Sequence, residues 1–339
     1  MKLITDYATP YELSVVARES AAERERVENK LAAVLPTETV DATTVTLIEG
    51  DNGRVEIAEY RAYDAETAFG HAGGPGRRQV VELAPLGQQA RVSEYDQLQM
   101  RNLGNVPERV RNSIGKTAVN LGRAVADRLE LARGEVLQTG MLTINEGGFI
   151  AEIDFGRDAD MAVTAATPWG TTGAGIIDEI NSWVDAYVEA NGQMPAAILA
   201  GRQVVTAIKK SEDMIAAASN GAVAQRVTTE FVQQFLEAEG LPQILQYDRK
   251  VLQGGAAVDV IDPKVMLFLP AAELGSGSTA MGTTLESQHP DYNMVPGEEP
   301  GIVVGAYQSH NPMGLYLNSA AIGLPVLHDP NAFMAATVL

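Results

Sequence analysis

The clearest hydrophobic pattern in the chain lies between residues 107 and 138. Apolar residues recur there at spacings of three and four, as on one face of a helix: Val110, Ile114, Ala118, Leu121, Val125, Leu129, Ala132 and Val136. Asn105 and Glu108 supply a cap pair around Pro107, and Gly140 follows the last turn. The pattern predicts one helix that extends roughly 48 Å at about 1.5 Å per residue, which is too long for a compact domain.

A second helix is expected near the amino-terminal end, where Thr9, Pro10 and Glu12 form a capping-box pattern. It is expected to run up to Pro36. In its middle part, residues 18–30, charged residues lie on nearly all sides. This predicts that the helix buries little surface within its own subunit. Two interpretations stay open, a solvated surface helix and an arm that docks on a neighbouring subunit.

Between these helices the pattern changes to short β-rich runs at 44–49, 55–60, 79–83 and 89–93. Asp51-Asn52-Gly53 predicts a hairpin turn between the first two runs, and the last two are expected to form a second pair around Pro85-Leu86-Gly87. The glycine-rich segment 70–76 is too flexible to belong to a packed core. Together these features predict a long projecting loop.

Strands and helices alternate after Gly140. Strands are expected at 141–144, 149–155, 197–200, near Ile244, near Val258 and at 265–269, and helices around 176–187, from Arg202 and over 229–239. Residues 301–339 are extended and end in an apolar run. Such a run is expected to be held in a sheet.

Composition narrows the classes of function. The chain is 45% hydrophobic and 20% charged, as is usual for a globular protein, and 44 acidic against 25 basic residues give a net charge of −19. This charge argues against a protein whose main task is to grip nucleic-acid phosphates. The absence of cysteine excludes disulfides, thiol catalysis and cysteine metal sites. No signal peptide and no apolar run of about 18 residues is present, so synthesis in the cytoplasm and no membrane contact are expected.

Charge is unevenly distributed along the chain. Residues 101–134 hold seven basic and three acidic residues, a net charge of 7 − 3 = +4. Residues 265–339 contain no lysine or arginine and six acids. The predicted long helix therefore carries a basic segment in an acidic protein.

No motif for catalysis or metal binding emerges. Residues 275–279 are glycine-rich but lack the lysine of a phosphate-binding loop. The acids within 154–160 are better explained as a solvated turn than as a divalent-ion patch. His328 and Asp329 would form a catalytic pair only with a nucleophile from elsewhere, and a capping role suits Asp329 better. No catalytic residue, cofactor or metal is expected.

The order of elements resembles that of the major capsid proteins of tailed bacteriophages, and specifically the lambda-type capsid family with the Hong Kong 97 capsid fold. That order is a charged arm, a projecting β-loop, one very long helix, an α/β block and extended carboxy-terminal strands. Three stretches carry the resemblance: 136–144 followed by 153–157 and Trp169; 274–284; and 325–339.

The resemblance implies an α+β subunit with five parts: an N-terminal arm 1–42, an E-loop with flanking strands 43–104, a P-domain 105–170 with a long spine helix, an A-domain 171–300, and C-terminal strands 301–339 that return to the P-domain. It implies a major capsid protein that self-assembles in the host cytoplasm into the icosahedral head of the virion, as hexamers and pentamers around double-stranded DNA. Scaffold, portal and decoration proteins are the implied partners.

In the fold that the resemblance implies, the spine faces the inside of the shell, where six basic residues are expected to face DNA: Arg109, Arg111, Lys116, Arg123, Arg128 and Arg133. A basic helix paired with acidic neighbours is the alternative. Some relatives join subunits through an E-loop lysine, but residues 43–104 contain no lysine, so no such bond is expected. Two other functions stay open, a soluble α/β metabolic enzyme, suggested by residues 171–270, and another virion component that forms rings or tubes.

Overall fold

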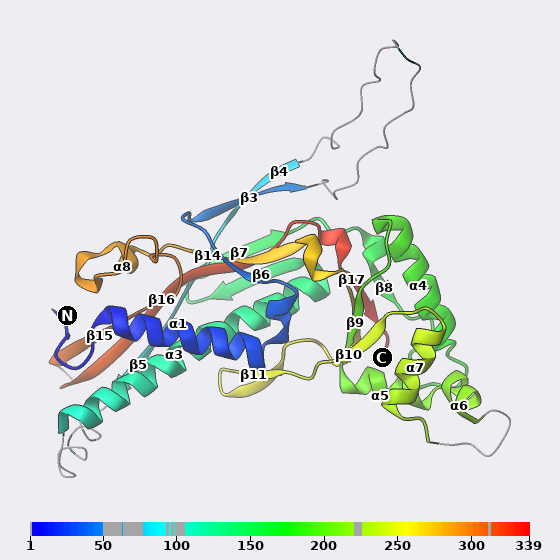
Figure 1. Cartoon of the computed structure of the whole chain (residues 1–339), viewed down its shortest axis with the longest axis horizontal. Coiled ribbons are helices and arrows are strands. Elements are labelled where there is room, and N and C mark those ends of the chain that lie inside the picture. Colours follow the sequence, from blue (N-terminus) through cyan, green and yellow to red (C-terminus); the bar gives the residue numbers. More distant parts are fainter. Residues whose placement is uncertain are drawn as a thin grey trace.

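A computed structural model describes residues 2–49, 77–92, 106–219, 226–310 and 313–339, together with positions 63, 95 and 98. The long helix α3, Val106–Thr139, runs along the body of the subunit (Figure 1). All eight apolar residues of its predicted stripe are buried. The prediction of one long helix with a single buried face is confirmed.

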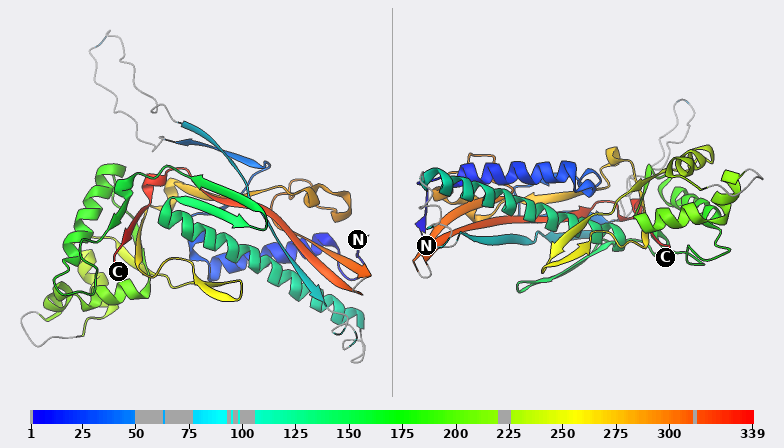
Figure 2. Two further views of the ribbon diagram at one scale, coloured as in Figure 1. Left: turned by 180° about the vertical axis from the view of Figure 1, so that it is seen from behind. Right: turned by 90° about the horizontal axis from the view of Figure 1, so that it is seen from below.

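A six-stranded sheet packs against α3. Its strands are β1 (Lys2–Leu3), β2 (Thr37–Thr39), β5 (Pro85–Val92), β14 (Gly277–Gly282), β15 (Val303–His310) and β16 (Met313–Leu327). They follow the order β1-β15-β16-β14-β2, and β5 pairs along the other edge of β16. Leu317 of β16 lies in one hydrophobic cluster with Leu121 and Val125 of α3. Helix and sheet together form an elongated and thin layer (Figure 2).

Helix α1, Pro10–Val27, lies alongside α3 (Figure 1). Its predicted capping box is confirmed, because the Glu12 N–H donates to Thr9 Oγ1 at 3.2 Å and the Thr9 N–H donates to Glu12 Oε2 at 2.9 Å. The helix ends earlier than predicted, and a short 3₁₀ turn at Lys30–Ala33 follows it.

The prediction that this helix buries little was wrong. Leu13, Ala17 and Ala21 of α1 are buried in the same cluster as the α3 stripe. Gly122 of α3 makes the close approach possible, since a Cβ atom at this position would lie 2.2 Å from the carbonyl oxygen of Ala17. A few small and apolar residues on one face of this charge-rich helix thus suffice to join α1 to its own subunit.

A five-stranded sheet with four helices forms the other end of the subunit (Figure 1). Its strands β8 (Ala162–Thr164), β9 (Ala197–Ala200), β10 (Gln243–Gln246), β13 (Val265–Leu269) and β17 (Met334–Thr337) follow the order β10-β9-β13-β17-β8. The helices are α4 (Ile176–Asn191), α5 (Arg202–Lys210), α6 (Glu212–Ser219) and α7 (Thr229–Ala238). Trp183 packs in this core, stacked on Trp169 at 5.9 Å between ring centroids.

Three hairpins and one short helix complete the described part. The hairpins are β3 (Thr44–Glu49) with β4 (Arg77–Glu82), β6 (Met141–Glu146) with β7 (Phe149–Asp154), and β11 (Lys250–Gln253) with β12 (Ala256–Asp259); the helix is α8 (Leu285–Gln288). The β3–β4 pair extends away from the body (Figure 1). The predicted run 55–60, its turn 51–53 and the segment 70–76 lie outside the described residues.

The expected strand pairing and part boundaries need two corrections. β5 pairs with β16 from Pro85–Ile322 to Val92–Leu315, and not with β4. The 15-residue strand β16 offers a long open edge, and β5 covers it in eight consecutive pairs. The sheets also cross the boundary expected at residue 300, because β14 pairs with β16, whereas β17 inserts between β13 and β8. Met334 of β17 fills the core of the five-stranded sheet.

Candidate functional site

The basic residues of α3 divide into three groups in the structure. Arg109, Lys116 and Arg123 are exposed and spaced by seven residues, which puts them on one stripe of the helix surface. At about 1.5 Å per residue this stripe extends roughly 21 Å. It lies away from the buried stripe of Leu121 and Val125. These three residues form the basic stripe of α3.

Two further predicted residues are exposed or half-buried beside acids. Arg111 Nη2 lies 3.9 Å from Glu12 Oε1, and Arg128 Nε lies 3.4 Å from Glu146 Oε2. The alternative interpretation of a basic helix paired with acidic neighbours therefore applies to these two positions. Exposed pairs of this kind contribute little to stability.

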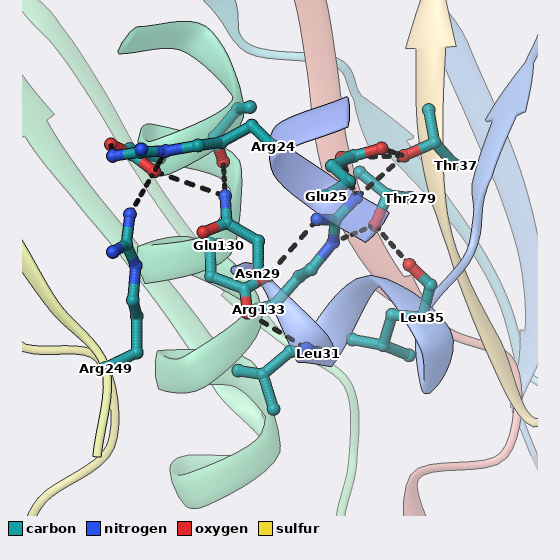
Figure 3. Close-up of polar contacts among 12 residues, drawn as sticks. Arg24, Glu25, Asn29, Leu31, Leu35, Thr37, Glu130, Arg133, Arg249 and Thr279 are labelled. Atoms are coloured by element: carbon teal, nitrogen blue, oxygen red, sulfur yellow. Dashed lines mark hydrogen bonds and ion pairs between the residues drawn. The ribbon is translucent and has the colours of Figure 1, made fainter. Parts of the chain in front are cut away.

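Arg133 was wrongly predicted to face DNA. Its side chain is fully buried and its guanidinium is surrounded by partners (Figure 3). Nη2 lies 2.7 Å from Glu25 Oε1, Nη1 lies 3.3 Å from Glu130 Oε2, Nε donates to Thr279 Oγ1 at 2.8 Å, and Nη2 donates to Thr37 Oγ1 at 2.7 Å. A charge this deep needs counter-charges and hydrogen bonds inside the protein, and it has no route to a ligand.

Glu130 is the buried counter-charge of Arg133. The Leu31 N–H donates to Glu130 Oε1 at 2.9 Å, and the Tyr247 hydroxyl donates to the same oxygen at 2.5 Å. Burial raises the pKa of the Glu130 carboxyl above its usual value, and these hydrogen bonds oppose the shift. Burial, and then the charge of Glu130, raise the pKa of Tyr247 as well. The network joins α1, the 3₁₀ turn and β2 after it, α3 and β14 (Figure 3). Tyr247, which follows β10, adds the next segment.

A second ionic cluster lies beside this network. Asp127 of α3 pairs with Arg24 at 2.9 Å and with Arg249 at 3.0 Å, and Glu28 Oε2 lies 2.6 Å from Arg249 Nη1. Burial raises the pKa of Asp127, but hydrogen bonds from Arg24 and Arg249 outweigh it and leave the pKa below its usual value. Both clusters therefore hold α1 against α3.

Two kinds of enzyme site are relevant among the described residues, a metal site and a serine–histidine–aspartate arrangement. The described residues contain no group of three histidine, aspartate or glutamate side chains that could hold a metal ion. His328 Nε2 lies 3.1 Å from Ser278 Oγ, but the Asp329 side chain accepts a hydrogen bond from the Asn331 N–H, as its predicted capping role requires. None of the described helices combines the length and apolar character needed to cross a membrane.

Comparison with known proteins identifies the family of this chain. A family model described as phage major capsid protein E matches residues 22–338. The chain belongs to this family. No curated protein sequence matches it significantly.

Two solved structures share the fold of this capsid protein E chain. A phage-related protein from Bordetella bronchiseptica RB50 has a TM-score of 0.61 and 14% identity, with 95% of this chain and 96% of that chain covered. A putative capsid protein of a prophage from Escherichia coli CFT073 has a TM-score of 0.62 and 13% identity, with 95% and 97% covered. The α+β fold is thus the Hong Kong 97-type capsid fold, as the sequence resemblance implied.

Membership in the capsid protein E family also gives the function. The chain is a phage major capsid protein that forms the head shell, and it is located in the capsid of the virion. The family is a capsid family and not an enzyme family. The basic stripe, the buried network and the elongated layer are therefore features of a subunit that associates with copies of itself.

Proposed function

We propose that this capsid protein assembles as hexamers and pentamers into an icosahedral head that encloses double-stranded DNA. The match of the family model to residues 22–338 carries the proposal. The thin, elongated subunit supports it, since a flat layer covers a large shell area with little core (Figure 2). Heterologous contacts between such subunits close into rings when the rotation between them closes.

The proposed parts of the subunit follow the ranges expected from the sequence, except that β14 belongs to the six-stranded sheet and β17 to the five-stranded sheet. The arm 1–42 and the loop region 43–104 contact neighbours, α3 acts as the spine of a P-domain 105–170, and the A-domain 171–300 meets its copies at the symmetry axes, with 301–339 completing the sheets. The projecting β3–β4 pair supports a role for the loop region in contacts between subunits (Figure 1). With no lysine in 43–104, the mature shell is held without an E-loop cross-link.

Other partners follow from the same proposal. Assembly takes place in the host cytoplasm with scaffold and portal proteins, and a decoration protein binds the finished shell. The subunit has no catalytic activity of its own.

Negative-stain microscopy of the purified assembled protein tests the proposal. We expect closed particles with an icosahedral outline, or at least pentamers and hexamers, in the megadalton range expected for a shell. Open rings or tubes would instead indicate another virion component. A stable monomer at every salt and protein concentration, with its scaffold present, would indicate a soluble enzyme and would contradict the proposal.

The basic stripe of α3 is proposed to face the packaged DNA. Arg109, Lys116 and Arg123 are its exposed cations, and net negative charge elsewhere keeps DNA from adhering to the whole surface. Arg111 and Arg128 lie on other sides of α3, beside Glu12 and Glu146, and do not belong to the stripe. The contact is non-specific, because phosphate contacts carry no sequence information.

Neutralising two residues of the stripe is expected to weaken DNA binding. For Lys116→Gln/Arg123→Gln, the slope of log affinity against log salt should become less steep by about two, since each lost phosphate contact removes about 0.9. Binding of a duplex fragment to isolated subunits across a salt series measures this slope. The matched control Lys250→Gln/Lys264→Gln loses the same charge outside α3. An equal change in both variants would show that net charge, and not the stripe, governs binding.

A further inference from the structure

A basic hollow lies at the β10 edge of the five-stranded sheet. It has a volume of about 480 Å³, and four cationic side chains line it, Arg202, Lys209, Lys210 and Arg226. Gln246, the last residue of β10, forms part of the same wall. The hollow thus gathers four of the chain's 25 basic residues in a protein of net charge −19.

These four cations have no ion-pair partner among the described residues of their own chain. Asp248, next to the hollow, is already engaged: the Arg202 N–H donates to its Oδ1 at 2.6 Å, and Gln246 Nε2 donates to its Oδ2 at 2.5 Å. Like charges held together without counter-ions repel one another. The hollow is therefore suited to an acidic partner from outside the chain.

The same sheet carries an acidic surface at its other edge. Helix α4 contains four acids and no basic residue in 16 positions. Asp178, Asp185 and Glu189 are exposed at spacings of seven and four, which puts them on one face of the helix. The first turn of α4 lies beside the segment that follows β8, because Glu179 on a different, half-buried face accepts hydrogen bonds from the Ala166 N–H and from Trp169 Nε1.

We propose that the basic hollow receives the acidic face of α4 from the next copy of the same chain. The inference rests on the proposed function, because these two surfaces would form the contact between neighbouring A-domains in a hexamer or pentamer. The hollow lies beside β10 and the first turn of α4 lies beside the segment after β8, and these are the two edge strands of one sheet. Opposite charges at opposite edges create a head-to-tail contact, the heterologous type that closes into rings.

Charge complementarity favours a second copy over nucleic acid as the occupant. Every subunit carries both surfaces, so each contact gives the cations of one hollow and the acids of one α4 helix a counter-charge. A DNA strand in the hollow would bring no positive charge to Asp178 and Asp185 and would approach a chain of net charge −19. The contact steers the correct neighbour into place, and like charges oppose the reversed orientation.

Charge reversal with a rescue arm tests the contact. Arg202→Glu/Lys209→Glu and Asp178→Lys/Asp185→Lys each reverse two charges seven residues apart on exposed or half-buried positions. Because like charges would then face each other, each double variant should give about tenfold fewer closed particles at low salt. Combining all four changes in one chain should restore most of the particle yield. Circular dichroism should show a folded subunit in every case.

The matched control is Glu230→Lys/Glu237→Lys on α7, with the same spacing and charge change. It should not rescue Arg202→Glu/Lys209→Glu. Unchanged yields for both doubles, or no rescue by the α4 pair, would overturn the inference while wild-type shells uphold the proposed function. Loss of duplex binding by isolated Arg202→Glu/Lys209→Glu subunits without rescue would assign the hollow to nucleic acid instead. A wild-type chain that forms no closed particle would overturn the proposed function and this inference together.

Discussion

Replacing Arg133 with alanine is expected to destabilise the subunit by about 3–5 kcal/mol, because breaking a buried ion pair leaves an uncompensated charge. The change would strand Glu130 in the core and Glu25 beside it, and would remove the hydrogen bonds to Thr37 and Thr279. Urea unfolding of the isolated subunit, followed by circular dichroism, measures the loss.

Two further variants sharpen this prediction. Arg133→Lys keeps the charge but lacks the planar fork that binds several partners at once, so its loss should be intermediate. Arg123→Ala removes the same residue type from an exposed position of the same helix and should change stability by no more than about 0.5 kcal/mol. Equal losses at 133 and 123 would contradict the buried network.

Val125→Asp is expected to prevent recovery of soluble subunit. Val125 is 4% exposed and packs in one cluster with Leu121 and Leu317 between α3 and the six-stranded sheet. A carboxylate there would have no counter-charge from these neighbours, whereas truncation at the neighbouring stripe position by Leu121→Ala should cost about 2–5 kcal/mol. The amount of soluble protein and its sedimentation check the result.

The control for this prediction places the same charge on the outer face of the helix. Asn120→Asp adds one carboxylate at an exposed position five residues earlier and should give normal particles. Normal particles from Val125→Asp would mean that the apolar stripe does not hold the sheet, and the packing of α3 described above would be wrong.

The sequence predicted those elements whose pattern is local and long. The α3 stripe repeats over seven turns and has a single structural solution, so its buried face could be assigned residue by residue. The cap of α1 was equally clear, because Thr9 and Glu12 complete each other within one turn. Short strands such as β11 and the short helix α6 were missed, since a few residues carry little pattern.

The buried network could not be read from charge alone. A basic residue on a helix is usually solvated, and this expectation placed Arg133 with the exposed cations. A weaker signal was present: Ala126, Glu130, Arg133 and Leu137 follow spacings of four, three and four, beside the apolar stripe. All four are buried. Two opposite charges between apolar residues on one helical face indicate a buried pair, but their partners on α1 and β14 lie over 90 residues away.

Pairing between distant strands was the other limit. The hydrophobic pattern located β4 and β5 but assigned them to each other, because neighbouring strands pair most often. The partner of β5 is β16, more than 200 residues later. Such a choice depends on which edge remains open in the finished sheet, and no local pattern encodes it.

The position of β16 also sets when a subunit becomes complete during synthesis. Val125 on α3 and Leu317 on β16 are packed in one cluster but are 192 residues apart in the chain. At about 5–20 residues per second, the ribosome needs roughly 10–40 seconds to deliver the strand that covers the helix. During this interval the six-stranded sheet of the nascent chain is incomplete. β1, β2 and β5 are synthesised first, and their pairing partners β15, β14 and β16 come later in the chain. A chain that terminates before Met313 therefore lacks β16, so the apolar stripe of α3 and the edge of β5 stay uncovered and the subunit cannot complete its six-stranded sheet.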